Sequence, residues 1–135
     1  MNSERIGTEA IGIIVTHGRL AEELLRTVEL IIGKLDYLYP ISGSDLCNED
    51  LIGDIKAIIR NAPGKNVVLF VDHFGGSCCA NSVRAVKGME GVKVISGVNL
   101  PLLLDFATKR GSMGFEEMVD HLIRRGRESV KVIDI

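Results

Sequence analysis

The sequence predicts an α/β fold in which a mainly parallel sheet has helices on both faces. Short and almost continuously apolar runs stand at Ile11–Val15 and Val67–Val71, apolar residues recur at helical spacing between such runs, and glycines break the pattern at their ends. An unbroken apolar run is typical of a strand that is covered on both sides. Strands that alternate with helices favour a parallel sheet with right-handed crossover connections.

The first half of the chain contains two strand-helix units. After the strand Ile11–Val15, Gly18 allows a tight turn, and leucine, valine and isoleucine then recur at helical spacing from Arg19 to Gly33. Tyr37–Ile41 is predicted to be a short second strand. The helix that follows is indicated by Leu51, Ile55, Ile58 and Ile59 and is expected to end before Pro63-Gly64.

The second half continues the alternation. Val67–Val71 is the clearest strand, and Ser77 is expected to cap the next helix. Val92–Ile95 predicts a fourth strand, followed by an Asn99 cap, and Val130–Ile135 predicts a last strand at an edge or facing a partner. The helical positions between them are Ala80, Val83 and Val86, then Pro101 in a first turn and Leu104 to Thr108, and finally Phe115, Met118, Val119, Leu122 and Ile123.

The composition is that of one ordinary globular domain over residues 1–135. With 46% hydrophobic residues the chain has enough apolar surface for a core, and a net charge of −2 disfavours nucleic-acid binding. The polar start lacks the features of a secretory signal, and no apolar stretch reaches the roughly 18 residues of a membrane span. Three cysteines suit a reducing compartment, so we expect a cytoplasmic protein.

Three predicted loops are candidates for chemistry, because functional sites of parallel sheets lie beyond the carboxyl ends of the strands. They are 16–18, 72–77 and 97–101. His17 stands where the first strand meets a helix, with Gly18 allowing the turn. From its position alone this imidazole is open to four roles: nucleophile, general base, metal ligand or buried spacer.

Asp72, at the end of the third strand, favours the role of nucleophile for His17. A carboxylate that accepts the proton of one imidazole nitrogen leaves the other nitrogen basic and correctly oriented, although Asp72 is equally suited to be a strand-end cap. The turn Gly75-Gly76-Ser77 offers N–H donors and a hydroxyl for phosphate oxygens, and it is also an ordinary tight turn. No nucleotide-binding glycine motif is present.

The remaining candidates are expected to be structural. His73 is open to lining the site rim, but an exposed residue without a role is favoured, and His121 is interpreted as a boundary or surface residue. Cys78 and Cys79 follow the glycine turn, where a helix N-terminus lowers a thiol pKa, but packing is favoured over redox sensing. The histidines and carboxylates have no ligand spacing, so no metal is expected.

The chain resembles the enzyme IIA component of the mannose/fructose/sorbose type of the bacterial sugar phosphotransferase system. The resemblance is carried by four motifs spread in order over nearly the whole chain. They are T-H-G-x-x-A-E-x-L-L from Thr16 to Leu25, L-F-V-D-x-F-G-G-S from Leu69 to Ser77, G-V-N-L-P from Gly97 to Pro101, and G-R-E-S-V from Gly126 to Val130.

The resemblance implies that His17 accepts phosphate from the carrier protein HPr and passes it to a IIB component. Nε2 would hold the phosphoryl group, Asp72 would bind Nδ1, and Gly18, Gly75, Gly76 and Ser77 would contact phosphate, with Thr16, Phe74 and Asn99 at the rim. The family further implies no cofactor, an indirect membrane link through IIC and IID, and a homodimer in which the C-terminal strand pairs across subunits.

Two departures from the family pattern affect partner choice. Arg19 stands where an aromatic residue often follows the histidine-glycine pair, and Cys78-Cys79 replaces the usual residues after the turn. The chain is expected to use a separate IIB protein. A regulatory module of the same fold, switched by phosphorylation of His17, is the alternative to transport. A related dihydroxyacetone-kinase phosphocarrier is disfavoured by the longer 72–77 turn, and the sugar is not indicated by these residues.

Overall fold

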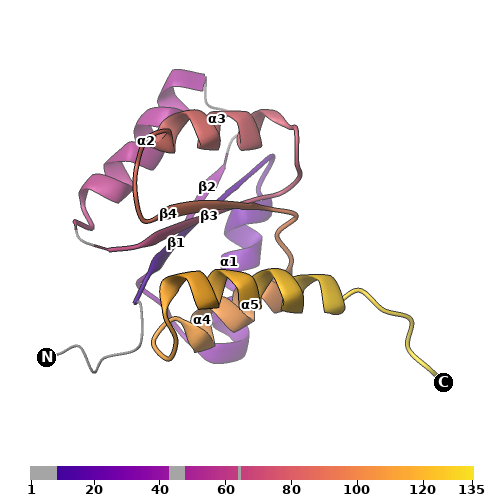
Figure 1. Cartoon of the computed structure of the whole chain (residues 1–135). Helices are drawn as coiled ribbons and strands as arrows, with labels where there is room; N and C mark the ends of the chain where they lie inside the picture. The colour runs from indigo at the N-terminus through magenta and orange to yellow at the C-terminus, as the bar shows by residue number, and fades with distance from the viewer. Residues whose placement is uncertain (1–8, 43–47, 64) are drawn as a thin grey trace, which may run out of the picture.

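The computed structural model describes residues 9–42, 48–63 and 65–135, which form alternating strands and helices (Figure 1). The strands are β1 (Ile11–Thr16), β2 (Leu38–Ser42), β3 (Val67–Val71) and β4 (Val92–Ser96). The helices are α1 (Leu20–Ile32), α2 (Asn48–Arg60), α3 (Ser77–Val86), α4 (Leu100–Lys109) and α5 (Phe115–Glu128). Each predicted element except the last strand is therefore confirmed, with ends that differ by a few residues.

The four strands form one parallel sheet in the order β2-β1-β3-β4. The register of the two central strands places Val15 beside Val71, so β1 and β3 end side by side. Both central strands are buried along their whole length, which explains why neither shows polar alternation in the sequence.

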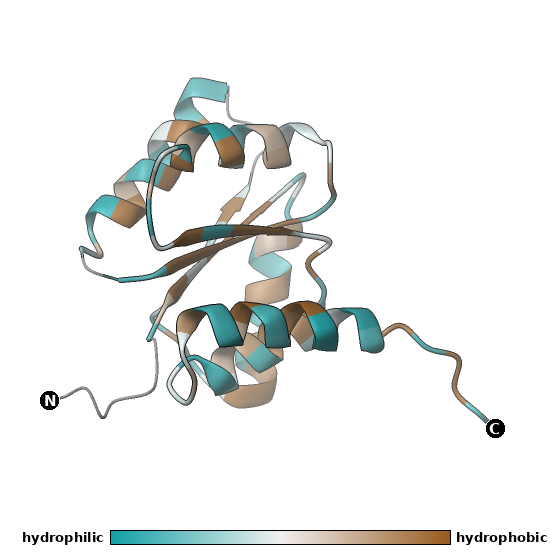
Figure 2. Cartoon of the chain, in the orientation of Figure 1, coloured by the Kyte–Doolittle hydropathy of each residue, from teal (hydrophilic) through white to brown (hydrophobic). Residues whose placement is uncertain are grey.

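Helices cover both faces of the sheet, as predicted. Helices α1, α4 and α5 pack on one face around Phe70, Phe106 and Leu103, and α2 and α3 pack on the other around Ile13, Leu69 and Ile55. Figure 2 shows the consequence in colour, because the strands are mostly brown, with a teal segment in β4, while the helices carry both brown and teal residues. The two cores are separated by the sheet, since successive strand side chains point to opposite faces.

The predicted strand Val130–Ile135 is wrong for the single chain. Helix α5 ends at Glu128, and residues 130–135 leave the body of the molecule without a strand neighbour (Figure 1). A strand needs an adjacent strand for its backbone hydrogen bonds, and the described residues place none beside this segment. The segment is left with exposed Val130, Val132, Ile133 and Ile135.

Two details of α3 also differ from expectation. The residue that caps α3 is Gly76, and Ser77 is already the first helical residue, with no side-chain cap. The buried face holds Cys78, Cys79, Asn81, Ser82, Ala85 and Val86, whereas the predicted apolar positions Ala80 and Val83 are exposed. The polar face is buried because α3 packs against α2, where Asn81 donates a hydrogen bond to Asn48 at 3.0 Å.

Other local predictions are confirmed. Asn99 caps α4 by accepting a hydrogen bond from the Leu102 N–H at 3.0 Å, and Pro101 lies in the first turn. Helix α2 ends at Arg60, before the predicted stop, of which Gly64 lies outside the described residues. The described helices include none with the length and apolar character to cross a membrane.

Candidate functional site

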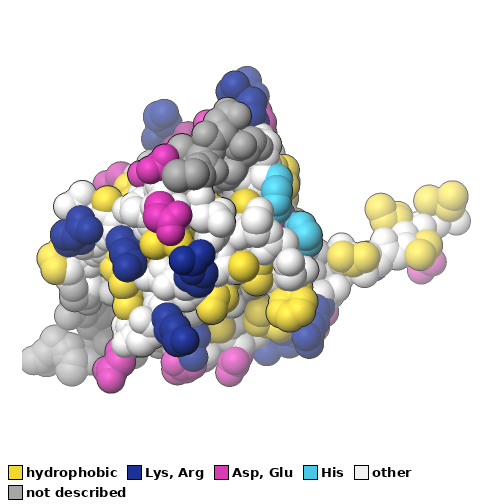
Figure 3. Space-filling model, turned by 90° about the horizontal axis from the view of Figure 1, so that it is seen from above, with side chains coloured by type: hydrophobic (Ala, Val, Ile, Leu, Met, Phe, Trp, Pro, Cys, Tyr) yellow, Lys and Arg dark blue, Asp and Glu magenta, His cyan; other side chains and the backbone are white. Residues whose placement is uncertain are grey.

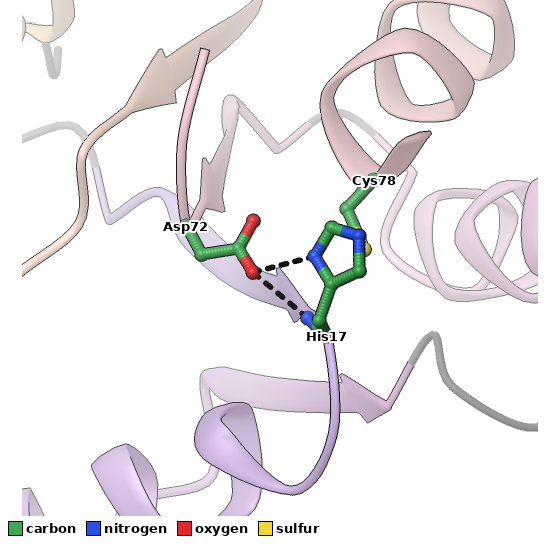
Figure 4. Close-up of side chains that lie close together, drawn as sticks. All are labelled: His17, Asp72 and Cys78. Carbon is green, nitrogen blue, oxygen red and sulfur yellow. Dashed lines mark hydrogen bonds and ion pairs between the residues drawn. The ribbon is translucent and has the colours of Figure 1, made fainter. Parts of the chain in front are cut away.

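The paired ends of β1 and β3 bring His17 and Asp72 together from opposite halves of the chain. Asp72 follows β3 directly, and His17 follows β1 directly. The Asp72 Oδ2 atom lies 2.8 Å from His17 Nδ1 and accepts a second hydrogen bond from the His17 backbone N–H at 2.9 Å. Figure 4 shows the carboxylate pointing at the edge of the imidazole, with both contacts dashed. The predicted pairing of these two residues is therefore present.

This geometry sets the tautomer of His17. An ionised carboxylate only accepts hydrogen bonds, so Nδ1 must carry the proton toward Asp72. In the neutral ring Nε2 then has a free electron pair, and it lies 3.1 Å from the Ser77 hydroxyl, which is able to donate to it. With 48% of its side chain exposed, His17 presents this nucleophilic nitrogen at the protein surface.

Asp72 is an ionised orienting group. Its side chain is only 13% exposed, and this burial alone would raise the pKa of the carboxyl. Hydrogen bonds from the backbone and ring of His17, and from the His73 N–H at 3.0 Å, outweigh burial and lower the pKa below its ordinary value. The carboxylate is therefore charged throughout the neutral range.

The predicted phosphate-binding turn lies beside the imidazole, because a Cβ atom on Gly76 would lie 3.3 Å from His17 Cε1. Gly76 caps α3, and the first N–H groups of a helix lack intrahelical partners. Gly18 has a positive φ of 58° that favours glycine, and its carbonyl accepts a hydrogen bond from Ser42 Oγ at 2.5 Å. Ser42 is a supporting residue that sequence reasoning missed, because a single serine at a strand end has no distinctive pattern.

The three predicted rim residues have different environments. Thr16 is fully buried, and its hydroxyl accepts a hydrogen bond from the Ala21 N–H at 2.7 Å, which ties the start of α1 to β1. Phe74 is 85% exposed on the turn. The Asn99 side chain bonds α4 and the end of α5, where its amide donates to the Gly126 carbonyl at 3.2 Å, rather than to His17.

The lesser candidates divide into three groups. His121 bonds Asp105 at 3.1 Å and is partly buried, as a boundary residue should be. His73 is exposed as predicted, but its ring stacks on His17. Cys78 and Cys79 are buried in the core under α3, which confirms packing. The expected lowering of a thiol pKa is wrong for Cys78, because burial, and then the charge of Asp72, raise its pKa to about 11.

One group of described side chains has ligand atoms close enough for a metal. Atoms of His17, Asp72 and Cys78 all lie within 4.8 Å of one another. Nδ1 and the carboxylate already bond each other, and Cys78 is a buried thiol with a raised pKa, so this donor set would have to lose its present contacts and a proton. That the site works without a metal stays a prediction.

The fold and the site together define a class of protein: an α/β domain that presents an exposed imidazole, oriented by a carboxylate, beyond the carboxyl ends of a parallel sheet. Residues 12–123 match the sequence profile of the family described as the PTS system fructose IIA component. The chain belongs to this mannose/sorbose-type family of enzyme IIA components, which are phosphoryl-transfer components of the sugar phosphotransferase system (PTS).

Individual relatives agree with this assignment. The mannose-specific EIIAB component of the PTS from Escherichia coli strain K12 is 33% identical over 126 residues, which is 90% of this chain, and the match covers only 38% of that longer protein. The sorbose-specific EIIA component from Lacticaseibacillus casei is 27% identical over 83% of this chain and 82% of its own. A solved EIIA structure from Streptococcus agalactiae shares the fold, with a TM-score of 0.84 at 24% identity over 91% of this chain and 96% of that one.

Proposed function

We propose that His17 carries a phosphoryl group on Nε2, taken from phosphorylated HPr and passed to a IIB component for sugar uptake through the membrane components IIC and IID. The observation that supports this proposal most directly is the 2.8 Å contact between His17 Nδ1 and Asp72, which leaves Nε2 as the nucleophile. Family membership supports the same role. The surface exposure of His17 suits transfer between proteins, since both partners must reach the same nitrogen.

In the proposed transfer the Nε2 electron pair attacks phosphorus in line with the bond to the donor imidazole. The new phosphorus–Nε2 bond forms as the old phosphorus–nitrogen bond breaks, and the departing electron pair stays on the HPr imidazole. The Nδ1 proton remains on His17, so the phosphorylated ring becomes cationic and is stabilised by the charge of Asp72. The second transfer to IIB reverses these steps at His17.

Ser77 and the start of α3 are proposed to hold the phosphoryl oxygens. The Ser77 hydroxyl, now 3.1 Å from Nε2, would rotate to donate to an oxygen once phosphorus occupies that electron pair. Free N–H groups at a helix start and the positive end of the helix dipole favour a bound phosphate. Phosphoryl transfer depends mainly on such placement and charge stabilisation.

The test of this function is a labelling assay with phosphoenolpyruvate, enzyme I and HPr. The chain is expected to take up label only when all three are present, as phosphate that is lost in acid and kept in base, and peptide mass spectrometry should locate it on His17. Label that survives acid, or that maps to another residue, would contradict the proposal.

Asp72→Asn is expected to slow phosphoryl transfer by about 10- to 100-fold, the size usual for the loss of a group that orients a histidine. Asparagine keeps an oxygen that accepts from Nδ1 but removes the charge that stabilises the phosphorylated ring. Rapid-quench labelling from phospho-HPr would measure the rate. An unchanged rate would show that Asp72 is only a strand-end cap.

The same variant has an expected signature in acid. Because the folded pKa of Asp72 lies below 3.8, its stabilising effect is complete at neutral pH and is lost as pH falls through that lowered value. The free energies of unfolding of wild type and Asp72→Asn, measured with a chemical denaturant, should therefore differ most above about pH 5 and become equal in strong acid.

The C-terminal segment is proposed to pair across a homodimer. Val132 is 92% exposed, and Val130, Ile133 and Ile135 are also exposed on an extended segment that a second copy would cover. Removal of residues 131–135 is expected to convert a dimer into a monomer by light scattering. A full-length chain that is monomeric at the same concentration would contradict this assembly.

A further inference from the structure

A second imidazole lies against His17. The ring centroids of His17 and His73 are 5.5 Å apart, and the ring planes are inclined by only 26°. Both residues are exposed, and Figure 3 shows two histidine side chains next to each other at the surface. His73 is therefore accessible to whatever approaches His17.

The two rings converge over the start of α3. A Cβ atom placed on Gly76 would lie 2.6 Å from His73 Nε2 and 3.3 Å from His17 Cε1. Cε1 is bonded to Nε2 within the imidazole, so His73 Nε2 lies near the edge of His17 that carries its ring nitrogens. Glycine at position 76 is what allows this approach, because a side chain there would push the rings aside.

The backbone of His73 is fixed by the group that orients His17. The His73 N–H donates to Asp72 Oδ1 at 3.0 Å, while the other oxygen of the same carboxylate binds His17. The side chains of Asp72, Ser77, Cys78 and His73 all lie close to the His17 ring, and of these four only His73 is able to carry a positive charge.

We propose that His73 is a second histidine of the phosphoryl site, whose imidazole donates a hydrogen bond to the phosphoryl oxygens on His17 and, when protonated, stabilises their negative charge. This inference rests on the proposed phosphorylation of His17. The phosphoryl group brings nearly two negative charges at neutral pH, and a charged donor forms stronger hydrogen bonds than a neutral one.

The consequence is a pH-dependent phosphorylation equilibrium. Imidazole is the side chain that gains its proton in the weakly acidic range. Among the described residues, the titratable groups in contact with His73 are Asp72 from the end of β3 and His17 from the end of β1, and Cys78 from α3 lies next to both of these groups. Asp72 stays ionised and Cys78 stays a thiol in this range, and His17 is common to every variant compared. Relative to a variant that is neutral at position 73, the phosphorylated form of the wild type should thus gain stability as pH falls.

The test compares wild type with His73→Gln and His73→Lys. Phosphorus NMR would measure the equilibrium constant for transfer from phospho-HPr at about pH 6 and about pH 8.5. His73→Gln, which donates but does not titrate, is expected to lower the constant about fivefold at the acidic pH and less than about twofold at the basic pH. The lysine of His73→Lys is charged at both pH values. Its equilibrium constant should therefore be close to that of wild type at the acidic pH and higher than that of wild type at the basic pH.

His121→Gln is the matched control, because it removes a histidine of α5 that bonds Asp105 of α4, away from His17. It should leave the pH dependence unchanged, and thermal unfolding should confirm that all variants are folded. If wild type and His73→Gln had the same equilibrium constant at both pH values, the proposal that the charge of His73 stabilises the phosphoryl group would be overturned. The same conclusion would follow if His73→Gln lowered the constant equally at both pH values. A wild type without phosphate on His17 would overturn the proposed function, and this inference with it.

Discussion

Replacing His17 with glutamine is expected to abolish phosphate uptake from HPr while leaving the fold in place. The glutamine amide nitrogen has no basic electron pair, so it cannot form the bond to phosphorus that Nε2 is proposed to form. The backbone N–H of residue 17 keeps its bond to Asp72, and the side chain is half-exposed. We therefore expect the free energy of unfolding to fall by about 1 kcal/mol or less.

The assay is the labelling reaction with phosphoenolpyruvate, enzyme I and HPr. His73→Gln is the natural control, because it changes the neighbouring imidazole and should still allow labelling. If the His17→Gln chain were labelled to the wild-type level, a residue other than His17 would be the phosphate acceptor. Loss of label together with loss of cooperative unfolding would instead show a damaged fold, and circular dichroism separates the two.

Replacing Phe106 with alanine should cause the largest loss of stability, about 3–5 kcal/mol. Phe106 is fully buried in α4 between the sheet and α5, and its ring meets that of Phe70 edge-on with centroids 5.2 Å apart. Truncation removes this contact and leaves a cavity in a rigid core. The free energy of unfolding of a native domain is about 5–15 kcal/mol in total, so the variant should be only marginally folded.

Phe74→Ala is a matched control for this effect, because the same side chain is 85% exposed there. Its free energy of unfolding should change by no more than about 0.5 kcal/mol. Urea unfolding with equal slopes for all three proteins would make the comparison direct. Similar losses for the two phenylalanines would mean that the core near α4 is packed differently.

The regular elements could be predicted because each has a local cause. The β3 bounds Val67–Val71 are those expected, since an apolar run between glycine-rich or polar segments marks a buried strand. For helix α3 the prediction is right for Val86 and wrong for Ala80 and Val83, because Asn81 and Ser82 are polar yet buried, and the burial of Asn81 depends on the neighbouring helix α2. The end of the chain was predicted as a strand from its residue types, but a strand also requires a neighbour.

The sequence could predict that His17 and Asp72 meet in the site, but it could not predict all the contacts made by the residues around them. His17 and Asp72 could be paired because both follow buried parallel strands. The stacking of His73 depends on the path of the 72–77 turn over Gly76, which no spacing reveals. Asn99 was assigned to the rim from its loop, whereas its amide bonds the end of α5, a contact 27 residues away along the chain.

The pairing of β1 with β3 gives phosphorylation a further meaning. His17, the proposed nucleophile, and the carboxylate of Asp72 are 55 residues apart and meet only when these two strands lie side by side. In a chain that has not yet joined its two halves, the imidazole at position 17 is an ordinary solvated histidine. If His17 is the phosphate acceptor as proposed, competence to receive phosphate is acquired with the sheet itself, and the rate at which labelling appears during refolding would measure the closure of the central strand pair.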